Sequence, residues 1–243
     1  MNYSFLQCGE GALTVHLGDG IDPAINRRVT ALQVAIGSAG LRGITDLIPA
    51  YADLTVCYDC TVISAKALQR QLRRLLDGLS VAGQDRRRVF RLPVCYGGDY
   101  GPDLDFVCHH SGLSAQEVIA LHSAPDYLIY MLGFLPGFAY LGGLDPRLHT
   151  PRLDSPRTCI PAGSVGIGGA QTGVYPLASP GGWQLLGRTP VSVFDRQRQE
   201  PILYRAGDLV HFVPISPAEY EEIARAVAAG TYTVQVEEVP VCD

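Results

Sequence analysis

The fold of the C-terminal part is decided by residues 133–190, which read GFLPGFAYLGGLDPRLHTPRLDSPRTCIPAGSVGIGGAQTGVYPLASPGGWQLLGRTP. Glycine and proline recur every few residues, yet apolar side chains such as Phe134, Phe138, Tyr175 and Trp183 stand between them. A flexible linker of this composition would be polar instead. Glycine therefore stands where the backbone takes a positive φ or approaches another group closely, and proline where φ is preset. This stretch predicts a tightly folded surface that holds a ligand or a partner.

The segments around this stretch predict a β-barrel-like domain over residues 92–243. Short strand patterns lie on both sides of it, at 127–132, 191–194, 202–204, 209–213 and 231–239. A helical pair over 102–123 precedes the stretch, and its second helix opens with a capping box formed by Ser114 and Glu117. A last helix begins near Pro217 and ends at Gly230. Many short strands with frequent turn signals are typical of a barrel.

Residues 1–83 predict a small α/β domain with the element order ββαββα. Asp22 and Pro23 open its first helix, and Ser64 caps its second. This order favours an antiparallel sheet with both helices on one face. Residues 84–91 contain Arg86, Arg87 and Arg88 and are interpreted as a charged, solvated connector between the two domains. The whole chain is thus expected to have an α+β fold.

Composition limits the classes of partner. The formal net charge of −5 argues against nucleic acid bound by bulk electrostatics. Neither a signal peptide nor an apolar run long enough to span a bilayer is visible, so a cytoplasmic location without membrane contact is expected. The seven cysteines lack framework spacing and fit reduced thiols. Cys57 and Cys60 form a CxxC, but on a strand they would face opposite ways, so no metal site is expected.

Several familiar catalytic motifs are missing. The glycine-rich run 163–173 has Gln171 in the place of the third glycine of GxGxxG, and no lysine follows it as in a P-loop. Lys66 is the only lysine of the chain, so phosphate contacts in this run could come only from backbone amides. The helical pair resembles a helix-turn-helix, but its second helix has no basic residue to contact DNA. No GxSxG, HExxH or triad order is present.

The candidate substrate-binding or interface residues are side chains set among glycines and aromatic rings. Arg188 is the only charged residue between Arg157 and Asp195. An isolated arginine suits bidentate capture of a carboxylate or phosphate, and it equally suits tying loop carbonyls together. No catalytic residue is assigned. The candidates are His122, Phe134, Phe138, Gln171, Thr172, Tyr175, Ser179, Trp183 and Arg188.

The long motifs PGFAYLGGLDPRLHTPRLDSPRT and IPAGSVGIGGAQTGVYPLASPGGWQLLGRTP resemble the signature of the carboxyltransferase-domain subunit 1 family. The resemblance extends upstream through LPVCYGGDYGPDL and GITDLIPAYADLTVCYD, and so covers nearly the whole chain. This family includes the B subunit of the prokaryotic 5-oxoprolinase complex, the kinase inhibitor KipI and the allophanate-hydrolase subunit 1 part of urea amidolyase.

The resemblance implies a small α/β N-terminal domain followed by a cyclophilin-like β-barrel. It implies ATP-dependent opening of 5-oxo-L-proline to L-glutamate, by a subunit that is inactive alone. The implied partners are a carboxyltransferase subunit 2, which is the C-type subunit, and the lactam-utilisation-type A subunit, and the ATP site would be shared with or located on a partner. The alternatives are KipI-like inhibition of a histidine kinase, and a role as subunit 1 of allophanate hydrolase or urea carboxylase. Fold alone does not decide among these functions.

Overall fold

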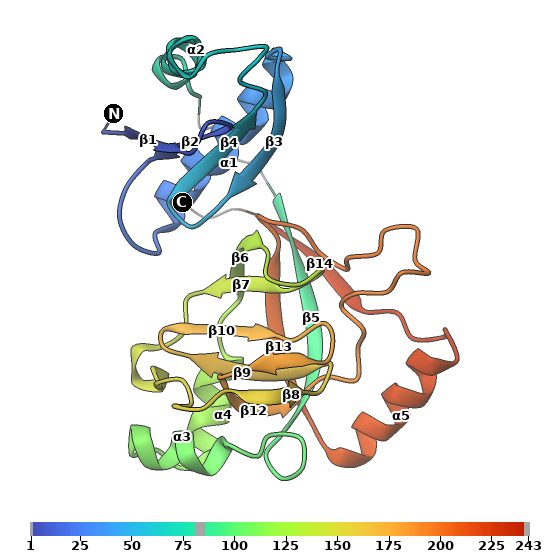
Figure 1. The fold of residues 1–243 in the computed structure, drawn as a ribbon. Coiled ribbons are helices and arrows are strands. Elements are labelled where there is room, and N and C mark those ends of the chain that lie inside the picture. The colour runs from blue at the N-terminus through green and yellow to red at the C-terminus, as the bar shows by residue number, and fades with distance from the viewer. Residues whose placement is uncertain (1, 81–85, 241–243) are drawn as a thin grey trace. The chain divides into compact units, whose positions relative to one another are not determined.

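The computed structural model describes residues 2–80 and 86–240, and the chain forms two compact units, residues 1–84 and 85–243 (Figure 1). Each unit has its own buried hydrophobic core. The architecture is mixed α+β, with a small sheet and its helices in the first unit and a closed barrel in the second, as expected from the sequence.

The first unit is a four-stranded antiparallel sheet with two helices. Its elements are β1 (Ser4–Cys8), β2 (Ala12–His16), α1 (Pro23–Ala39), β3 (Ile44–Pro49), β4 (Asp53–Tyr58) and α2 (Ala65–Asp77), and the strand order is β1-β2-β4-β3. Asp22 caps α1 by accepting from the backbone N–H of Ala24 at 2.6 Å, and Ser64 caps α2. Both helices bury their apolar stripes in one cluster with β2 and β4, so they cover the same face of the sheet.

The second unit is built around a barrel of seven strands. Its elements are β5 (Arg86–Tyr96), α3 (Leu104–Ser111), α4 (Ala115–Ser123), β6 (Tyr127–Leu132), β7 (Ala139–Gly142), the short 3₁₀ helix η1 (Pro146–Leu148), β8 (Arg157–Ile160), β9 (Ser164–Gly168), β10 (Gln171–Val174), β11 (Ser179–Gly181), β12 (Gln184–Arg188), β13 (Leu209–Ile215), α5 (Pro217–Ala228) and β14 (Gln235–Pro240). The strands follow the order β12-β9-β10-β7-β6-β13-β5, and a pairing between β12 and β5 closes the ring. β14 adds to β5 outside the ring, and β8 pairs with β11 in a separate ribbon.

Closure of the barrel depends on Gly187. Its backbone pairs with that of Tyr96, and a Cβ at this position would lie 2.6 Å from the carbonyl oxygen of Cys95. Real Cβ atoms do not approach a carbonyl oxygen so closely, so only glycine lets β12 reach β5. The barrel interior is filled by apolar side chains from all sides, with Leu92, Ile129 and Phe212 among the fully buried ones.

The predicted connector is wrong for residues 86–91. These residues form the first half of β5, and residues 84–85 lie outside the described residues. Two of the three arginines that suggested a solvated linker, Arg86 and Arg88, have acidic partners far away in the sequence. The Arg88 guanidinium binds Asp208, with Nη2 and Oδ2 2.6 Å apart, and Arg86 lies 3.4 Å from Glu238. A run of like charges does not reveal partners that approach from distant strands.

Other sequence-based assignments are confirmed or corrected by the elements. The helical pair is confirmed as α3 and α4, which are joined at Gly112 in the left-handed conformation, and the capping box of α4 is present. The segments 191–194 and 202–204 are not strands; only an isolated bridge links Phe194 and Ile202. No helix within residues 2–80 and 86–240 is long and apolar enough to cross a membrane.

Candidate functional site

The strands β9, β10 and β12 separate two hydrophobic clusters, one inside the barrel and one on its outer side. Val165 and Ile167 point inward and belong to the barrel core. The alternate positions of β9 are Gly166 and Gly168, and Leu185 covers the first and Trp183 the second from outside. The outer aromatic cluster consists of Phe138, Ile160, Tyr175, Trp183 and Leu185, with Leu135 and Tyr140 at its margin.

Three glycines of residues 133–190 are required by these rings. A Cβ at Gly168 would collide with the indole of Trp183, and a Cβ at Gly173 would lie 3.2 Å from the same ring. A Cβ at Gly181 would lie 2.6 Å from the hydroxyl oxygen of Tyr175. The tryptophan therefore lies directly on the backbone of two neighbouring strands. Close approach is the reason for glycine at these positions, as the sequence suggested.

Within the outer aromatic cluster the rings meet edge to face. The Phe138 ring is the centre of the cluster, with ring centroids 5.2 Å from Tyr140, 5.5 Å from Tyr175 and 5.5 Å from Trp183. Interplanar angles of 64 to 77° identify these pairs as T-shaped, an arrangement that aromatic quadrupoles favour. Burial raises the pKa of the Tyr175 hydroxyl, which therefore stays protonated at neutral pH.

Phe134 extends this cluster into solvent. Its ring contacts Phe138 edge to face at 5.6 Å, yet 65% of the residue is exposed. Its φ of 66° lies in the left-handed region, and it is the only non-glycine residue with a positive φ among the described residues. A bulky residue rarely adopts this backbone conformation, which costs on the order of 1 kcal/mol or more. The loop between β6 and β7 thus holds a large apolar ring outward at a cost to the fold.

Two arginines that the sequence did not single out border the outer aromatic cluster. The Arg152 guanidinium carbon lies 5.9 Å from the centre of the Trp183 ring. Arg157 donates to the carbonyl oxygen of Trp183 at 3.4 Å and binds the Asp103 carboxylate at 2.7 Å. The five members of the cluster are themselves buried, so the apolar side chains that reach solvent here are those at its margin, Phe134, Leu135 and Tyr140. This margin beside the guanidinium group of Arg152 fits a ligand that combines an apolar body with a carboxylate or phosphate.

Asp103 holds this side of the barrel together, and sequence reasoning missed it. Its second oxygen accepts from the backbone N–H of Leu185 at 2.6 Å, and the carboxylate is almost fully buried. Just before it, Gly101 packs directly on the backbone of Leu186, where a Cβ would have no room. The only signal in the sequence was the motif LPVCYGGDYGPDL, which contains Gly101 and Asp103.

The candidates His122 and Thr172 lie inside the barrel and not on the outer side. Both residues are fully buried. The Thr172 hydroxyl donates to the carbonyl oxygen of Gly166 at 3.0 Å and lies 2.8 Å from His122 Nε2, so it accepts the proton of Nε2. His122 Nδ1 is then unprotonated and accepts from the Tyr96 hydroxyl at 2.8 Å. Burial lowers the pKa of His122 to about 3, so the ring is neutral.

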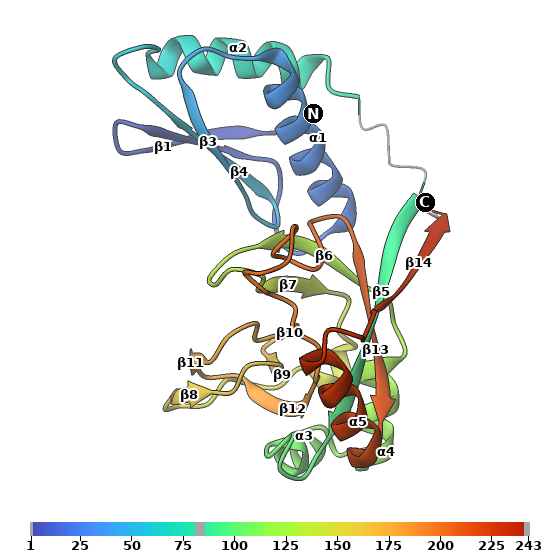
Figure 2. The same cartoon turned by 90° about the vertical axis from the view of Figure 1, so that its right-hand side faces the viewer.

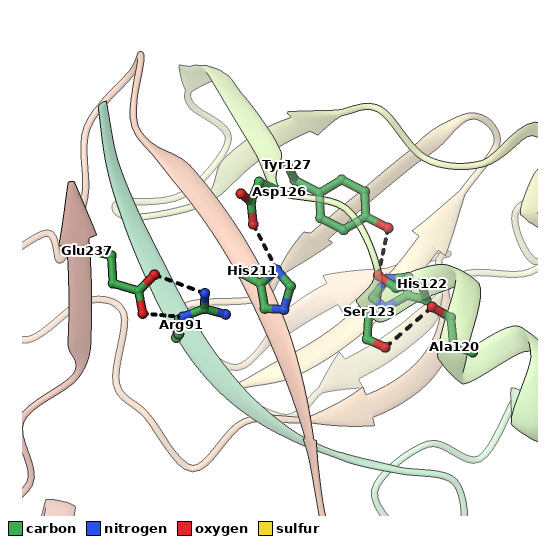
Figure 3. A network of polar contacts seen from close by, with 8 residues as sticks. All are labelled: Arg91, Ala120, His122, Ser123, Asp126, Tyr127, His211 and Glu237. Carbon is green, nitrogen blue, oxygen red and sulfur yellow. Dashed lines mark hydrogen bonds and ion pairs between the residues drawn. The ribbon is translucent and has the colours of Figure 1, made fainter. Parts of the chain in front are cut away.

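The backbone of His122 is fixed as well. The Tyr127 hydroxyl donates to the carbonyl oxygen of His122 at 2.8 Å, as Figure 3 shows. Nearby on the strands β5 and β13, Arg91 binds Glu237 at 2.8 and 2.9 Å, and His211 lies 2.8 Å from Asp126 (Figure 3). The hydrogen bonds from Arg91 lower the pKa of the Glu237 carboxyl. These contacts hold neighbouring segments of the barrel wall together around His122. The residue itself is fully buried and has no access to solvent.

The remaining candidates belong to the outer side. Gln171 pairs with Gly168 and thus stands at an outward position of β10, and Ser179 pairs with Ile160 of the outer aromatic cluster. The Ser179 hydroxyl is buried and has no hydrogen-bond partner among the described residues. Arg188 lies further along β12, opposite Ser164, and its Nε donates to the carbonyl oxygen of Ala162 at 2.9 Å. The structure therefore separates the nine candidates into an outer group and the pair His122 and Thr172 inside the barrel.

The glycine-rich run 163–173 is a β-hairpin. Its two arms are β9 and β10, and the turn lies at Gly169, whose φ is 66°. Most of its amides on β9 and β10 are used in the strand ladder and are therefore not available to a phosphate. Within residues 2–80 and 86–240, no group of three or more histidine, cysteine, aspartate or glutamate side chains is arranged to hold a metal ion.

The comparisons with known proteins agree with this architecture. The family model "Carboxyltransferase domain, subdomain C and D" matches residues 3–204. The chain belongs to this family. The match begins one residue before β1 of the small unit and ends beyond the outer aromatic cluster of the barrel, so it includes all nine candidate residues.

Two curated relatives have the same name. The chain is 42% identical over 230 residues to the B subunit of 5-oxoprolinase from Bacillus subtilis (strain 168), covering 90% of this chain and 96% of that protein. It is 45% identical over 207 residues to the B subunit of 5-oxoprolinase from Escherichia coli O157:H7, covering 85% of this chain and 93% of that protein. These similarities extend over both structural units.

A solved structure resembles the chain in three dimensions. The crystal structure of TTHA0988 superimposes with a TM-score of 0.74 at 41% identity and covers 84% of this chain. This chain spans only 40% of the length of TTHA0988. The same fold therefore also occurs as the smaller part of a longer polypeptide.

Proposed function

We propose that this chain is the B subunit of a heteromeric, ATP-dependent 5-oxoprolinase, which opens 5-oxo-L-proline to L-glutamate. The supporting observation is the identity of 42 to 45% to proteins of that name over nearly their full length. In the overall reaction one water opens the lactam and a second water takes up the phosphoryl group of ATP, giving glutamate, ADP and inorganic phosphate. The proposed partners are a carboxyltransferase subunit 2 of the C type and a lactam-utilisation-type A subunit.

The outer aromatic cluster is the part of this chain that we assign to the shared site. Its five central residues are buried, and its margin offers the exposed ring of Phe134, the partly exposed Leu135 and Tyr140, and the guanidinium groups of Arg152 and Arg157. 5-Oxoproline is a small, flat ring with one carboxylate, and its chemistry fits an apolar margin beside an arginine. This chain would bind and orient the substrate, while ATP would bind at a site shared with or located on a partner. Alone, the chain would be inactive.

Phe134 is the proposed contact to one of the partners. A residue that is held outward in a costly backbone conformation gains nothing for the isolated chain, whereas a partner pocket could bury its ring. Burying a phenylalanine side chain contributes roughly 1.5–3 kcal/mol to association. Aromatic anchors of this kind commonly dominate the binding energy of an interface.

The test is reconstitution of the three-subunit complex. We expect glutamate to be released from 5-oxoproline only when the three subunits and ATP are present together. Phe134→Ala should weaken assembly at least tenfold, as measured by analytical ultracentrifugation or co-purification. Phe106→Ala is the matched control, because Phe106 is an exposed aromatic residue of α3 outside the proposed site. A complete complex that leaves 5-oxoproline intact would refute the proposed function.

A further inference from the structure

A groove in the small N-terminal unit is separate from everything described above. It has a volume of about 770 Å³ and lies between the strand β1 and the helix α2. We call it the β1–α2 groove, and its lining residues are Asn2, Tyr3, Ser4, Phe5, Gln69, Arg73, Leu76 and Asp77. Neither the candidate site nor the proposed function uses it.

The strand side of the groove is a free edge of the sheet. The order β1-β2-β4-β3 leaves β1 with a single neighbour among the described residues, so one side of its backbone is unpaired. Four consecutive residues, Asn2 to Phe5, line the groove. Side chains of consecutive strand residues point to opposite faces, so the groove follows the edge of the strand and not one of its faces. An edge of this kind accepts an additional strand through main-chain hydrogen bonds.

The helix side of the groove is formed by residues on one side of α2. Gln69, Arg73, Leu76 and Asp77 follow at intervals of four, three and one residues and therefore lie on one side of the helix. Leu76 is buried and forms the apolar base, and Figure 2 shows α2 running alongside the strands of this sheet. An extended segment that lies between a sheet edge and a helix touches both at once, as in known cases of strand addition.

The charges of α2 indicate which charged side chains the bound segment has. Lys66, Arg70, Arg73 and Arg74 are exposed and outnumber its one acidic residue, although the whole chain has a net charge of −5. In the part of the chain that the structure describes, Arg73 takes part in no ion pair. Its guanidinium carbon lies 5.6 Å from the centre of the Phe5 ring, which holds the cation over the strand side of the groove. A carboxylate on the incoming segment would complement it.

Asp77 provides a second charged contact for the bound segment, next to that of Arg73. It follows Arg73 by four residues, which is about 6 Å along a helix axis. Two residues of an extended strand span about 6.6 Å, and their side chains point to the same face. An acidic residue and a basic residue two positions apart would therefore meet Arg73 and Asp77 together.

We propose that the β1–α2 groove binds an extended segment of a partner protein, which adds to β1 as a fifth strand and carries an acidic and a basic side chain two residues apart. The main-chain hydrogen bonds to β1 would provide affinity, and the two charged contacts would provide specificity. This inference does not depend on the proposed enzymatic function, because it uses only the first unit.

The test uses the full-length chain and a short fluorescent peptide. The peptide has valines at alternate positions and, between them, a glutamate and, two residues later, a lysine. We expect saturable binding by fluorescence anisotropy, and slower hydrogen exchange at the β1 amides when the peptide is bound. A peptide with glutamine at both charged positions should bind at least tenfold more weakly. Absence of saturable binding, or unchanged exchange in β1, would overturn the proposal.

Variants of α2 separate specific recognition from general charge attraction. Arg73→Glu and the milder Arg73→Gln should weaken binding at least tenfold. Arg74→Glu makes the same change in charge one residue further on, outside the groove, and should leave affinity within about twofold. The double variant Arg73→Glu with Asp77→Lys should instead prefer the peptide in which lysine and glutamate are exchanged. Equal losses at Arg73 and Arg74, or no exchange of preference, would show that the groove does not read this pattern.

Discussion

The Thr172 hydroxyl lies 2.8 Å from Nε2 of His122 and 3.0 Å from the carbonyl oxygen of Gly166, so it accepts from one group and donates to the other. With Tyr96 on the other nitrogen of the ring, the imidazole has a partner at both nitrogens. All of this lies inside the barrel, where an unsatisfied polar group costs roughly 1–3 kcal/mol. The position of His122 is thus a matter of stability.

Thr172→Val should destabilise the protein by about 1–3 kcal/mol, because it leaves the buried His122 Nε2–H without an acceptor. Valine has nearly the same shape as threonine, so packing changes little. Chemical denaturation measures the loss in the free energy of unfolding. Thr158→Val is the control, since Thr158 is exposed on β8 and should change the value by less than about 0.5 kcal/mol. Equal stability of the two variants would contradict the buried network.

The stability of the protein should fall as the pH is lowered from about 6.5 towards 4. Burial lowers the pKa of His122 from 6.5 to about 3 in the folded state. Between these values the unfolded chain binds a proton that the folded chain does not, so acid favours unfolding by up to about 1.4 kcal/mol per pH unit. Above pH 6.5 both states are neutral at this residue and its contribution is constant.

Comparison with His122→Gln isolates this effect. Glutamine cannot take up a proton in this pH range, so the variant should be less stable at pH 7 but should lose less stability between pH 6.5 and 4. His16 acts in the opposite direction, because its hydrogen bond to Asp53 raises its pKa, but it is present in both proteins and cancels in the difference. Parallel pH profiles for the two proteins would contradict a neutral, buried His122.

The sequence predicted most elements of the fold, and its errors have physical causes. Local signals are sufficient for α1, α2 and α4, because Asp22, Ser64 and Ser114 are caps that act within a few residues. The start of β5 was missed because its arginines are neutralised by Asp208 and Glu238 from distant segments. Pairing over more than one hundred residues leaves no trace in local composition.

The site shows the same division between local and distant information. The aromatic residues among glycines were predicted to be tightly folded, and the close packing of Trp183 on Gly168 and Gly173 agrees with that prediction. The predicted ligand-binding surface is a different matter, since the rings of the cluster are buried. Thr172 and Tyr175 were placed in one group of candidates. They are three positions apart in the sequence, and strand residues an odd number of positions apart face opposite sides of the barrel wall, so one side chain lies inside the barrel and the other outside. Asp103 and Arg152 were missed because their partners, Leu185 and Trp183, are brought to them only by the closed barrel.

Gly168→Ala should destabilise the second unit by roughly 1–3 kcal/mol, because the new methyl group collides with the indole of Trp183. Trp183 is the only tryptophan in the sequence, so selectively excited tryptophan fluorescence reports on the outer aromatic cluster. We expect a red-shifted emission and a lower denaturation midpoint. Gly37→Ala is the control, because nothing lies within 4 Å of its new Cβ in α1, and it should be neutral or stabilising by up to about 1 kcal/mol. An unchanged tryptophan spectrum in Gly168→Ala would contradict the packing described above.

Arg188→Ala tests whether this arginine binds a ligand or ties a loop. Its Nε donates to the carbonyl oxygen of Ala162, but Ala162 is exposed and water can replace that donor, so the free energy of unfolding should fall by less than about 1 kcal/mol. If the other nitrogens of the guanidinium bind a substrate carboxylate, the reconstituted complex should show a KM for 5-oxoproline that is raised about 10- to 100-fold, the equivalent of 1.5–3 kcal/mol. Arg188→Lys keeps the positive charge but lacks the planar guanidinium group, so its KM for 5-oxoproline should lie between those of the wild type and Arg188→Ala. A large loss of stability with an unchanged KM would assign Arg188 to the loop instead.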